Sequence, residues 1–145
     1  MAIPSAAVIT AGKRQSPLLF DTFPGLARNL PWIPLAHAPT AVEECAAIYP
    51  WLGRADVWMK RDDLVSPLYG GNKVRRYEFV LAEAQAAGAE RLVTSGSLAT
   101  TQAMATALFG HALGFQVCAI LYRWCALTHF ARDTILNLAG AGVEL

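Results

Sequence analysis

The chain has few charged side chains and few cysteines. Charged residues make up 16% of its 145 residues and the formal net charge is +1, against roughly 25% charged residues in typical soluble domains. Arginine and lysine are scattered without a basic stripe, which argues against nucleic acid as a partner. Three widely spaced cysteines, Cys45, Cys118 and Cys125, indicate reduced thiols in a cytoplasmic protein rather than a disulfide framework.

Several other signals are missing. No cysteine or histidine pair has zinc-ligand spacing and there is no HExxH sequence, so we expect no metal site. No apolar run approaches the ~18 residues of a membrane-spanning helix, because the most apolar stretch, 107–122, is broken by glycine, histidine and glutamine. The N-terminus lacks the basic region and long apolar core of a signal peptide. We therefore expect neither membrane insertion nor secretion.

Apolar residues, in contrast, are abundant. They form 54% of the chain, and the mean hydropathy is +0.34. Such a composition favours an apolar surface that meets a partner. A second copy of the chain, in a homodimer, or a missing C-terminal half are the two partners we expect.

The first 52 residues predict an N-terminal arm and helix. Six of the eight prolines lie in residues 1–40, which favours an irregular arm. Thr40 and Glu43 have the spacing of a capping box, so a helix is expected to run to about Ile48 and to end before Pro50. Residues 53–145 then form the second unit, an α/β domain.

In this second unit, strand and helix patterns alternate. Strands are predicted at 55–60, 91–95, 116–122 and 143–145, and helices at 72–87, 100–113 and 127–138. Glycines 88, 114 and 140 are the expected helix stops. This order predicts an α/β fold with a parallel sheet and flanking helices. Because the last strand only begins at residue 143, we expect the chain to be part of a longer, two-domain enzyme.

A lysine in an unusual place is the main functional signal. In Gly70-Gly71-Asn72-Lys73 two glycines make a tight loop, and the helix begins at about Asn72. A cation in the first turn of a helix is mildly unfavourable, and the same field favours the neutral amine that forms a Schiff base. Lys73 is therefore a candidate anchor for pyridoxal phosphate. The alternative is a glycine turn with a solvated lysine. The spacing matches neither a P-loop nor a dinucleotide fingerprint.

A second candidate is the polar loop at 94–102, between a predicted strand and helix. Its hydroxyls, free backbone N–H groups and helix N-terminus could bind a carboxylate or a phosphate. The alternative is simple helix capping by Ser97, Thr100 or Thr101.

The third candidate is Lys60-Arg61-Asp62-Asp63. Paired acids could serve acid–base chemistry or a metal. A charge-paired turn is favoured, because no further carboxylate lies nearby in the sequence.

Taken together, these segments resemble a known family. Residues 56–121, with the K-R-D-D turn, the GGNK-x-R block and the T-x-G loop, are similar to the 1-aminocyclopropane-1-carboxylate deaminase / D-cysteine desulfhydrase family. Its members are pyridoxal phosphate enzymes with a tryptophan synthase β-like fold. Their later half supplies the glycine-rich cup for the cofactor phosphate and the partner of the pyridine nitrogen.

The resemblance implies specific roles. Lys73 would be the Schiff-base lysine and would move protons at or near the substrate α-carbon, with Thr100 as a second catalytic residue. Asn72 and Thr101 would contact the cofactor. Thr100, Thr101 and Gln102, in the place of the family's Ser-Asn-His or Ser-Asn-Gln, would bind the substrate.

The implied function is a lyase or deaminase that acts on a small amino acid and releases ammonia and a keto acid, with sulfide from a cysteine-like substrate. The alternative function is a non-catalytic α/β remnant that binds a small anion or a partner chain.

Overall fold

The computed structural model describes residues 16–124 and 126–145. The N-terminal segment of the described residues is less irregular than the prolines predict, because it contains the short helices α2 (Leu18–Thr22) and η1 (Pro24–Arg28). An extended segment follows. The part of the predicted arm at residues 1–15 lies outside the described residues.

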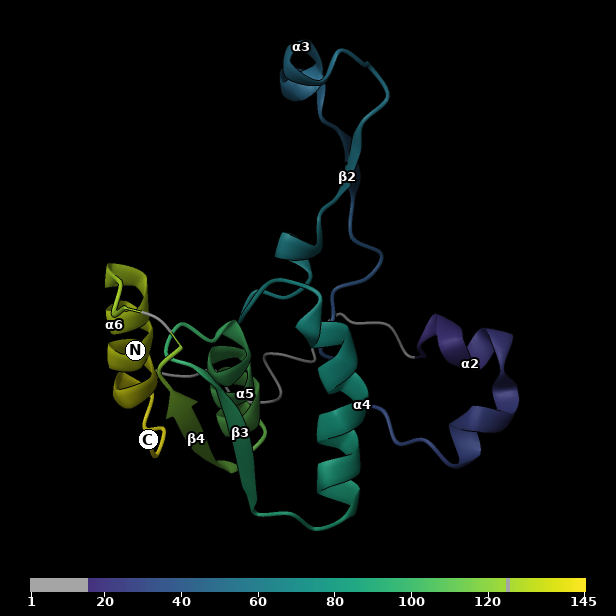
Figure 1. Ribbon diagram of the computed structural model, residues 1–145. Helices are drawn as coiled ribbons and strands as arrows, with labels where there is room; N and C mark the ends of the chain where they lie inside the picture. The colour runs from purple at the N-terminus through teal and green to yellow at the C-terminus, as the bar shows by residue number, and fades with distance from the viewer. Residues whose placement is uncertain (1–15, 125) are drawn as a thin grey trace.

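A long hairpin projects from the body of the molecule (Figure 1). Its strands β1 (Val42–Glu44) and β2 (Trp58–Lys60) pair antiparallel, and η2 (Ala46–Ile48) and α3 (Tyr49–Leu52) lie at its tip. All six strand residues are exposed. The strand predicted at 55–60 is therefore present in shortened form.

The helix predicted from Thr40 to about Ile48 is wrong. Thr40 and Glu43 make contacts distant in sequence, because Thr40 donates to Asp62 and Arg61 donates to Glu43. These tertiary contacts take the place of the capping box. The expected stop before Pro50 is wrong as well, since Pro50 lies in the first turn of α3, where a proline costs no helical hydrogen bond.

The central helix α4 (Lys73–Ala86) follows the prediction closely. It begins one residue after the expected start, and Gly88 follows it with a φ of +70°. Between β2 and α4 the chain forms the short helix η3 (Asp62–Leu64) and then the glycine loop.

The predicted parallel sheet is confirmed. Strands β3 (Arg91–Ser97) and β4 (Gln116–Tyr122) pair in parallel from Arg91–Gln116 to Ser97–Tyr122, and Glu144 adds a parallel bridge to Cys118. Helices α5 (Thr101–Ala112) and α6 (His129–Gly140) lie on one face of this sheet (Figure 1). Gly140 belongs to α6 instead of ending it, and the turn comes at Gly142, whose φ is +78°.

Two apolar clusters hold these layers together. One joins α4 and α5 to the extended N-terminal segment and contains Leu35, Leu81 and Phe109. The other joins α5, β4 and α6. Glu78 of α4 holds the N-terminal segment against the helix, because its buried carboxylate accepts hydrogen bonds from the backbone N–H groups of Leu35 at 2.9 Å and Ala36 at 2.8 Å.

The opposite face of the sheet is open to solvent. Val93, Ile120 and Tyr122 are 64%, 59% and 50% exposed. Within the described residues, no helix has the length and hydrophobicity needed to cross a bilayer. Cys45 and Cys118 are free thiols, and Cys125 lies outside the described residues. The predicted division of the chain at residue 52 stays a prediction.

Candidate functional site

The glycine loop places Lys73 at the very start of α4. Gly71 has a φ of +97°, a left-handed conformation that favours glycine. Gly70 has no room for a side chain, because a Cβ atom there would overlap the carbonyl group of Asp63. Asn72 is the N-cap residue, and its side chain makes no capping hydrogen bond. The two glycines thus allow the tight path that leads into Lys73.

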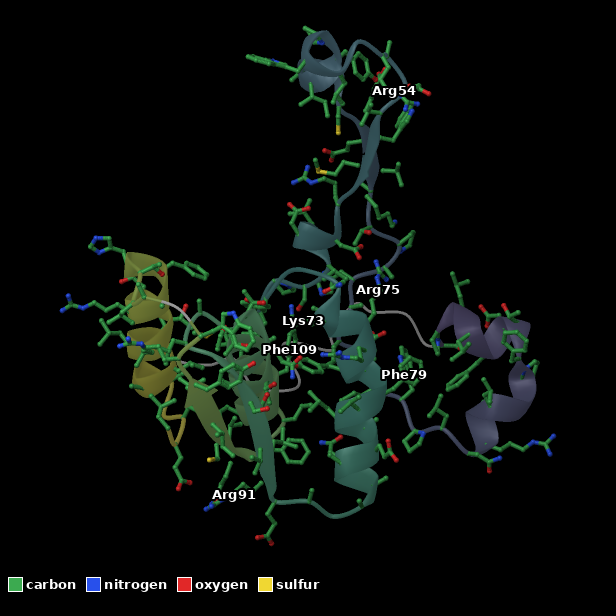
Figure 2. The ribbon with its side chains drawn as sticks, viewed as in Figure 1. Arg54, Lys73, Arg75, Phe79, Arg91 and Phe109 are labelled. Carbon is green, nitrogen blue, oxygen red and sulfur yellow. The ribbon has the colours of Figure 1, made fainter. Side chains whose placement is uncertain are left out.

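The side chain of Lys73 reaches the N-terminal end of a second helix. Its Nζ atom donates a hydrogen bond of 3.0 Å to Oγ1 of Thr101, the first residue of α5. Figure 2 shows Lys73 at the N-terminal end of α4, close to α5. Two of the predicted site residues, 28 positions apart in sequence, are therefore in direct contact.

Thr100 caps α5. Its Oγ1 atom accepts the backbone N–H of Ala103 at 3.4 Å, as the capping alternative predicts. Gly96 is required beside it, because a Cβ atom at that position would lie 2.5 Å from Oγ1 of Thr100. The T-x-G pattern therefore has a steric reason, whereas the catalytic role of Thr100 stays a prediction.

Gln102 points toward α4. Its Oε1 atom accepts a hydrogen bond of 3.1 Å from Nη2 of Arg76, and its backbone carbonyl accepts one from Tyr77. A cavity of about 330 Å³ lies beside this contact, between α4 and the β3–α5 unit. It is lined by Arg76, Gln102 and mostly apolar side chains such as Val80 and Leu92. Its volume lies within the range of small-molecule sites.

Tyr69 and Arg76 belong to the site although no sequence pattern selected them. Burial raises the pKa of the Tyr69 phenol, and an interaction with the Thr101 side chain opposes that rise. Arg76 binds Gln102. Both flank the GGNK block, so their proximity to the motif is the one sequence signal that could have selected them.

The acidic turn before the glycine loop is charge-paired, as favoured in the sequence. Arg75 donates to Oδ1 of Asp62 at 2.8 Å, and Arg61 binds both Asp63 and Glu43. Hydrogen bonds from the arginines are the main cause of the lowered pKa of Asp62 and of Asp63. Across residues 16–124 and 126–145, no cluster of three potential metal-ligating side chains occurs.

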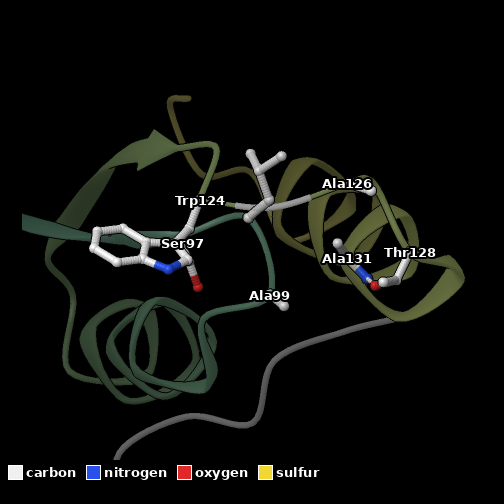
Figure 3. Close-up of a pocket in the computed structure, with 7 residues that line it drawn as sticks. Ser97, Ala99, Trp124, Ala126, Thr128 and Ala131 are labelled. Atoms are coloured by element: carbon white, nitrogen blue, oxygen red, sulfur yellow. Dashed lines mark hydrogen bonds between the residues drawn. The ribbon is translucent and has the colours of Figure 1, made fainter.

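A smaller cavity lies at the other side of the polar loop (Figure 3). Ser97 and Ala99 line it together with Trp124 and the first turn of α6. Its volume is about 40 Å³, which suits a few water molecules at most. This space is too small for a cofactor and marks where the loop packs against α6.

Comparisons with known proteins give a consistent result. Nocardicin C-9' epimerase from Nocardia uniformis subsp. tsuyamanensis is 41% identical over 116 residues, which are 80% of this chain and 34% of that protein. D-cysteine desulfhydrase from Salmonella paratyphi B is 36% identical over 93 residues, which are 64% of this chain and 28% of that protein. No family model matches the chain.

A comparison with solved structures supports the same relationship. A structure described as an ACC deaminase homologue matches with a TM-score of 0.66 and 29% identity, over 90% of this chain and 37% of that one. The chain thus spans about a third of the length of the proteins that it matches.

Proposed function

We propose that this chain provides the lysine that binds pyridoxal phosphate in an active site. The chain belongs to the 1-aminocyclopropane-1-carboxylate deaminase / D-cysteine desulfhydrase family over the part that it shares with its relatives. The enzyme would be a lyase or deaminase that acts on a small amino acid. Lys73 would hold the cofactor aldehyde as a Schiff base, with loss of water.

One observation carries this proposal. The Lys73 amine lies 3.0 Å from the Thr101 hydroxyl, where the N-terminal ends of α4 and α5 meet. Helix N-termini favour anionic groups, and an amine beside them can react with an aldehyde. The donor set therefore fits the aldehyde end of the cofactor and a substrate carboxylate.

The phosphate end of the cofactor needs other residues. The sequence contains no glycine-rich loop after Lys73 that could serve as the phosphate cup of the family. We therefore place the cup on a partner segment that corresponds to the rest of the longer relatives. The open sheet face with Val93, Ile120 and Tyr122 gives such a partner an apolar surface to cover, because parallel sheets are usually buried on both faces.

Each residue of the site would have a separate role. Lys73 would hold the cofactor, release it to the substrate amine and then move a proton at the substrate α-carbon. Thr101 would orient the amine of Lys73. Gln102 uses its amide oxygen to bind Arg76, so its amide nitrogen is the group that could donate to the substrate carboxylate. When bound, the cofactor supplies an electron sink for the charge that develops at the α-carbon.

The relatives differ in the reaction that their names describe. One is an epimerase, one a desulfhydrase and one a deaminase homologue. We propose the elimination reaction, in which sulfide leaves a cysteine-like substrate and one water molecule then hydrolyses the product to ammonia and a keto acid. The shared requirement, a lysine that moves a proton next to the substrate amine, is what Lys73 would meet.

The test is covalent attachment of pyridoxal phosphate to the 145-residue chain. Two results together support the proposal: a visible Schiff-base absorbance, and a stable adduct at Lys73 after borohydride reduction. Lys73→Arg is the matched control, because arginine keeps the positive charge and forms no Schiff base. Equal absorbance in the wild type and in Lys73→Arg would exclude Lys73 as the anchor.

The alternative function is a non-catalytic remnant that binds a partner chain. The open apolar face of β3 and β4 favours it. In that case the association state would change on replacing Ile120 with a charged residue, and Lys73→Arg would change neither association nor ligand binding. Size-exclusion chromatography of the Ile120 variant tests the partner surface, which both functions use. Pyridoxal phosphate labelling separates the two functions, because only the enzyme function requires a label at Lys73 that Lys73→Arg loses.

A further inference from the structure

We propose that Asp62 is the residue that positions Lys73. This inference rests on the proposed function of Lys73, and it assigns to the acidic turn a task in that site. The turn and the glycine loop are separate motifs in the sequence, and the structure joins them through this one residue.

Asp62 holds the chain on both sides of the lysine. Its backbone carbonyl accepts the N–H of Gly71 at 2.7 Å, and its carboxylate accepts Nη2 of Arg75 at 2.8 Å. Gly71 lies two residues before Lys73 and Arg75 two residues after it. The first turn of α4 is therefore fixed at two points to the same residue.

Asp62 is itself held in place. The hydroxyl of Thr40 donates to Oδ1 of Asp62 at 3.1 Å and accepts from Arg75 at 3.3 Å. Thr40 is only 7% exposed, and its carbonyl oxygen accepts a hydrogen bond from Lys60. The three side chains of Thr40, Asp62 and Arg75 thus form a closed triangle that limits the freedom of each.

The charge of Asp62 matters as well as its geometry. The first turn of α4 carries Lys73, Arg75 and Arg76, no acid of its own and no side-chain cap. Positive charge is unfavourable there, because it faces the positive end of the helix dipole. Asp62 brings the missing negative charge from outside the helix. The hydrogen bond from Arg75 is the first cause of its lowered pKa, so Asp62 is ionised at neutral pH and stays ionised at more acidic pH than an ordinary aspartate.

Asp62 would in this way fix the position of the Lys73 amine. A reacting group that is displaced by about 1 Å can lose on the order of a hundredfold in rate. If Asp62 sets the position of the first turn, removing its carboxylate shifts the amine of Lys73 away from Thr101 and from an incoming aldehyde. Asp62 itself touches no reacting atom in this scheme, so it is a positioning residue.

The experiment compares Asp62→Ala, Asp62→Asn and the control Asp56→Ala. Asp56 forms an ion pair of 2.6 Å with Arg54 on the projecting hairpin, and both partners are exposed, so its loss changes little. Circular dichroism first establishes that each variant is folded. If Asp62→Ala does not fold, Asp62→Asn, which keeps the side-chain shape and an acceptor for Arg75, decides the test.

The first readout needs no cofactor. Amide hydrogen exchange at Gly71 should become about tenfold faster in Asp62→Ala, with an intermediate value in Asp62→Asn. The backbone carbonyl of residue 62 still accepts the Gly71 N–H in the variant, but the residue loses the charge-assisted hydrogen bond from Arg75 that holds it beside the turn. Asp56→Ala should keep the wild-type rate. Wild-type exchange at Gly71 in a folded Asp62→Ala variant would overturn the inference.

The second readout is the site of pyridoxal phosphate labelling after borohydride reduction, measured by peptide mass spectrometry. The ratio of label at Lys73 to label at all other amines of the chain should fall about tenfold in Asp62→Ala and remain unchanged in Asp56→Ala. An unchanged ratio also overturns the inference. If the wild type shows no preference for Lys73, the proposed function fails, and the exchange at Gly71 still decides whether Asp62 positions the turn.

Discussion

The amine of Lys73 and the hydroxyl of Thr101 are joined by a hydrogen bond of 3.0 Å that links the first turns of two helices. Each residue follows a required glycine, Gly70 in the loop before Lys73 and Gly96 near the end of β3 before Thr101, where a side chain would collide with neighbouring atoms. Steric constraints therefore act on the chain just before each of the two side chains. This pairing is what the proposed site is built on.

Thr100 allows a direct separation of structural and chemical roles. Thr128 caps α6 in the same way that Thr100 caps α5, with a bond of 3.1 Å to the N–H of Ala131. Thr100→Ala and Thr128→Ala should each lower the free energy of unfolding by about 1 kcal/mol, the usual cost of losing a threonine cap. Urea denaturation measures both.

The same pair then tests chemistry. If Thr100 contacts substrate or cofactor, Thr100→Ala should slow labelling of Lys73 by pyridoxal phosphate, whereas Thr128→Ala should leave it unchanged. Equal labelling in the two variants would reduce Thr100 to a helix cap.

The glycine loop gives a second prediction. Gly70→Ala places a methyl group against the backbone of Asp63, and Gly71→Ala forces an alanine to a φ of +97° in open space. Gly71→Ala should cost about 1–2 kcal/mol, the penalty of a left-handed residue with a Cβ, and Gly70→Ala more, since its obstacle is backbone that must move. Thermal unfolding checks the order. Gly25→Ala, which meets no atom within 4 Å, is the control, and a loss as large as that of Gly70→Ala there would contradict the steric argument.

The sequence predicted the parts of the fold that depend on local pattern. The helix at Lys73–Ala86, the strand at Gln116–Tyr122 and the parallel order follow from apolar periodicity and glycine stops. The helix from Thr40 failed because its signal was equally local, while the capping residues Thr40 and Glu43 bind partners at least 18 positions away. A capping box predicts a helix only when no tertiary partner competes for its side chains.

The candidate site was predictable to a similar extent. The glycine block selected Lys73, and the resemblance to a family selected Thr101 and Gln102 within the polar loop. Their contacts were not visible, because the bonds of Lys73 with Thr101 and of Arg76 with Gln102 cross 28 and 26 positions. Spacing within a motif carries no information on such distances. The resemblance to a family linked the motifs, and the fold gave the reason for their proximity.

Glu78 gives a third prediction. Its Oε1 atom accepts two backbone N–H groups at 2.9 and 2.8 Å in a buried position. Glu78→Ala leaves both donors unsatisfied and should lower the free energy of unfolding by roughly 2–4 kcal/mol. Glu78→Gln keeps an oxygen at the same place and should recover much of this loss. Chemical denaturation of both, with the exposed Glu83→Ala on the same helix as control, checks the prediction. Equal losses in Glu78→Ala and Glu83→Ala would show that the two bonds contribute little.

The pH dependence of stability provides the last prediction. The pKa of Asp62 is lowered in the folded state, first by the hydrogen bond from Arg75 and further by Thr40, against an opposing effect of burial. Between its folded and unfolded pKa values the unfolded chain binds more protons, so stability rises with pH in that window. The contribution of Asp62 is fully present above about pH 4, its unfolded value, and is lost as the pH falls through its lower folded value.

Asp62→Asn removes this titration, so the drop in thermal stability between pH 5 and pH 3 should be smaller in the variant than in the wild type. Asp56→Asn is the control for position, because the pKa of Asp56 is also lowered by an arginine, Arg54, but in an exposed pair that solvent screens. Its effect on the acid-induced drop should be the smaller of the two. The opposite ranking would mean that the triangle of Thr40, Asp62 and Arg75 holds the first turn of α4 no more firmly than a surface ion pair holds its loop.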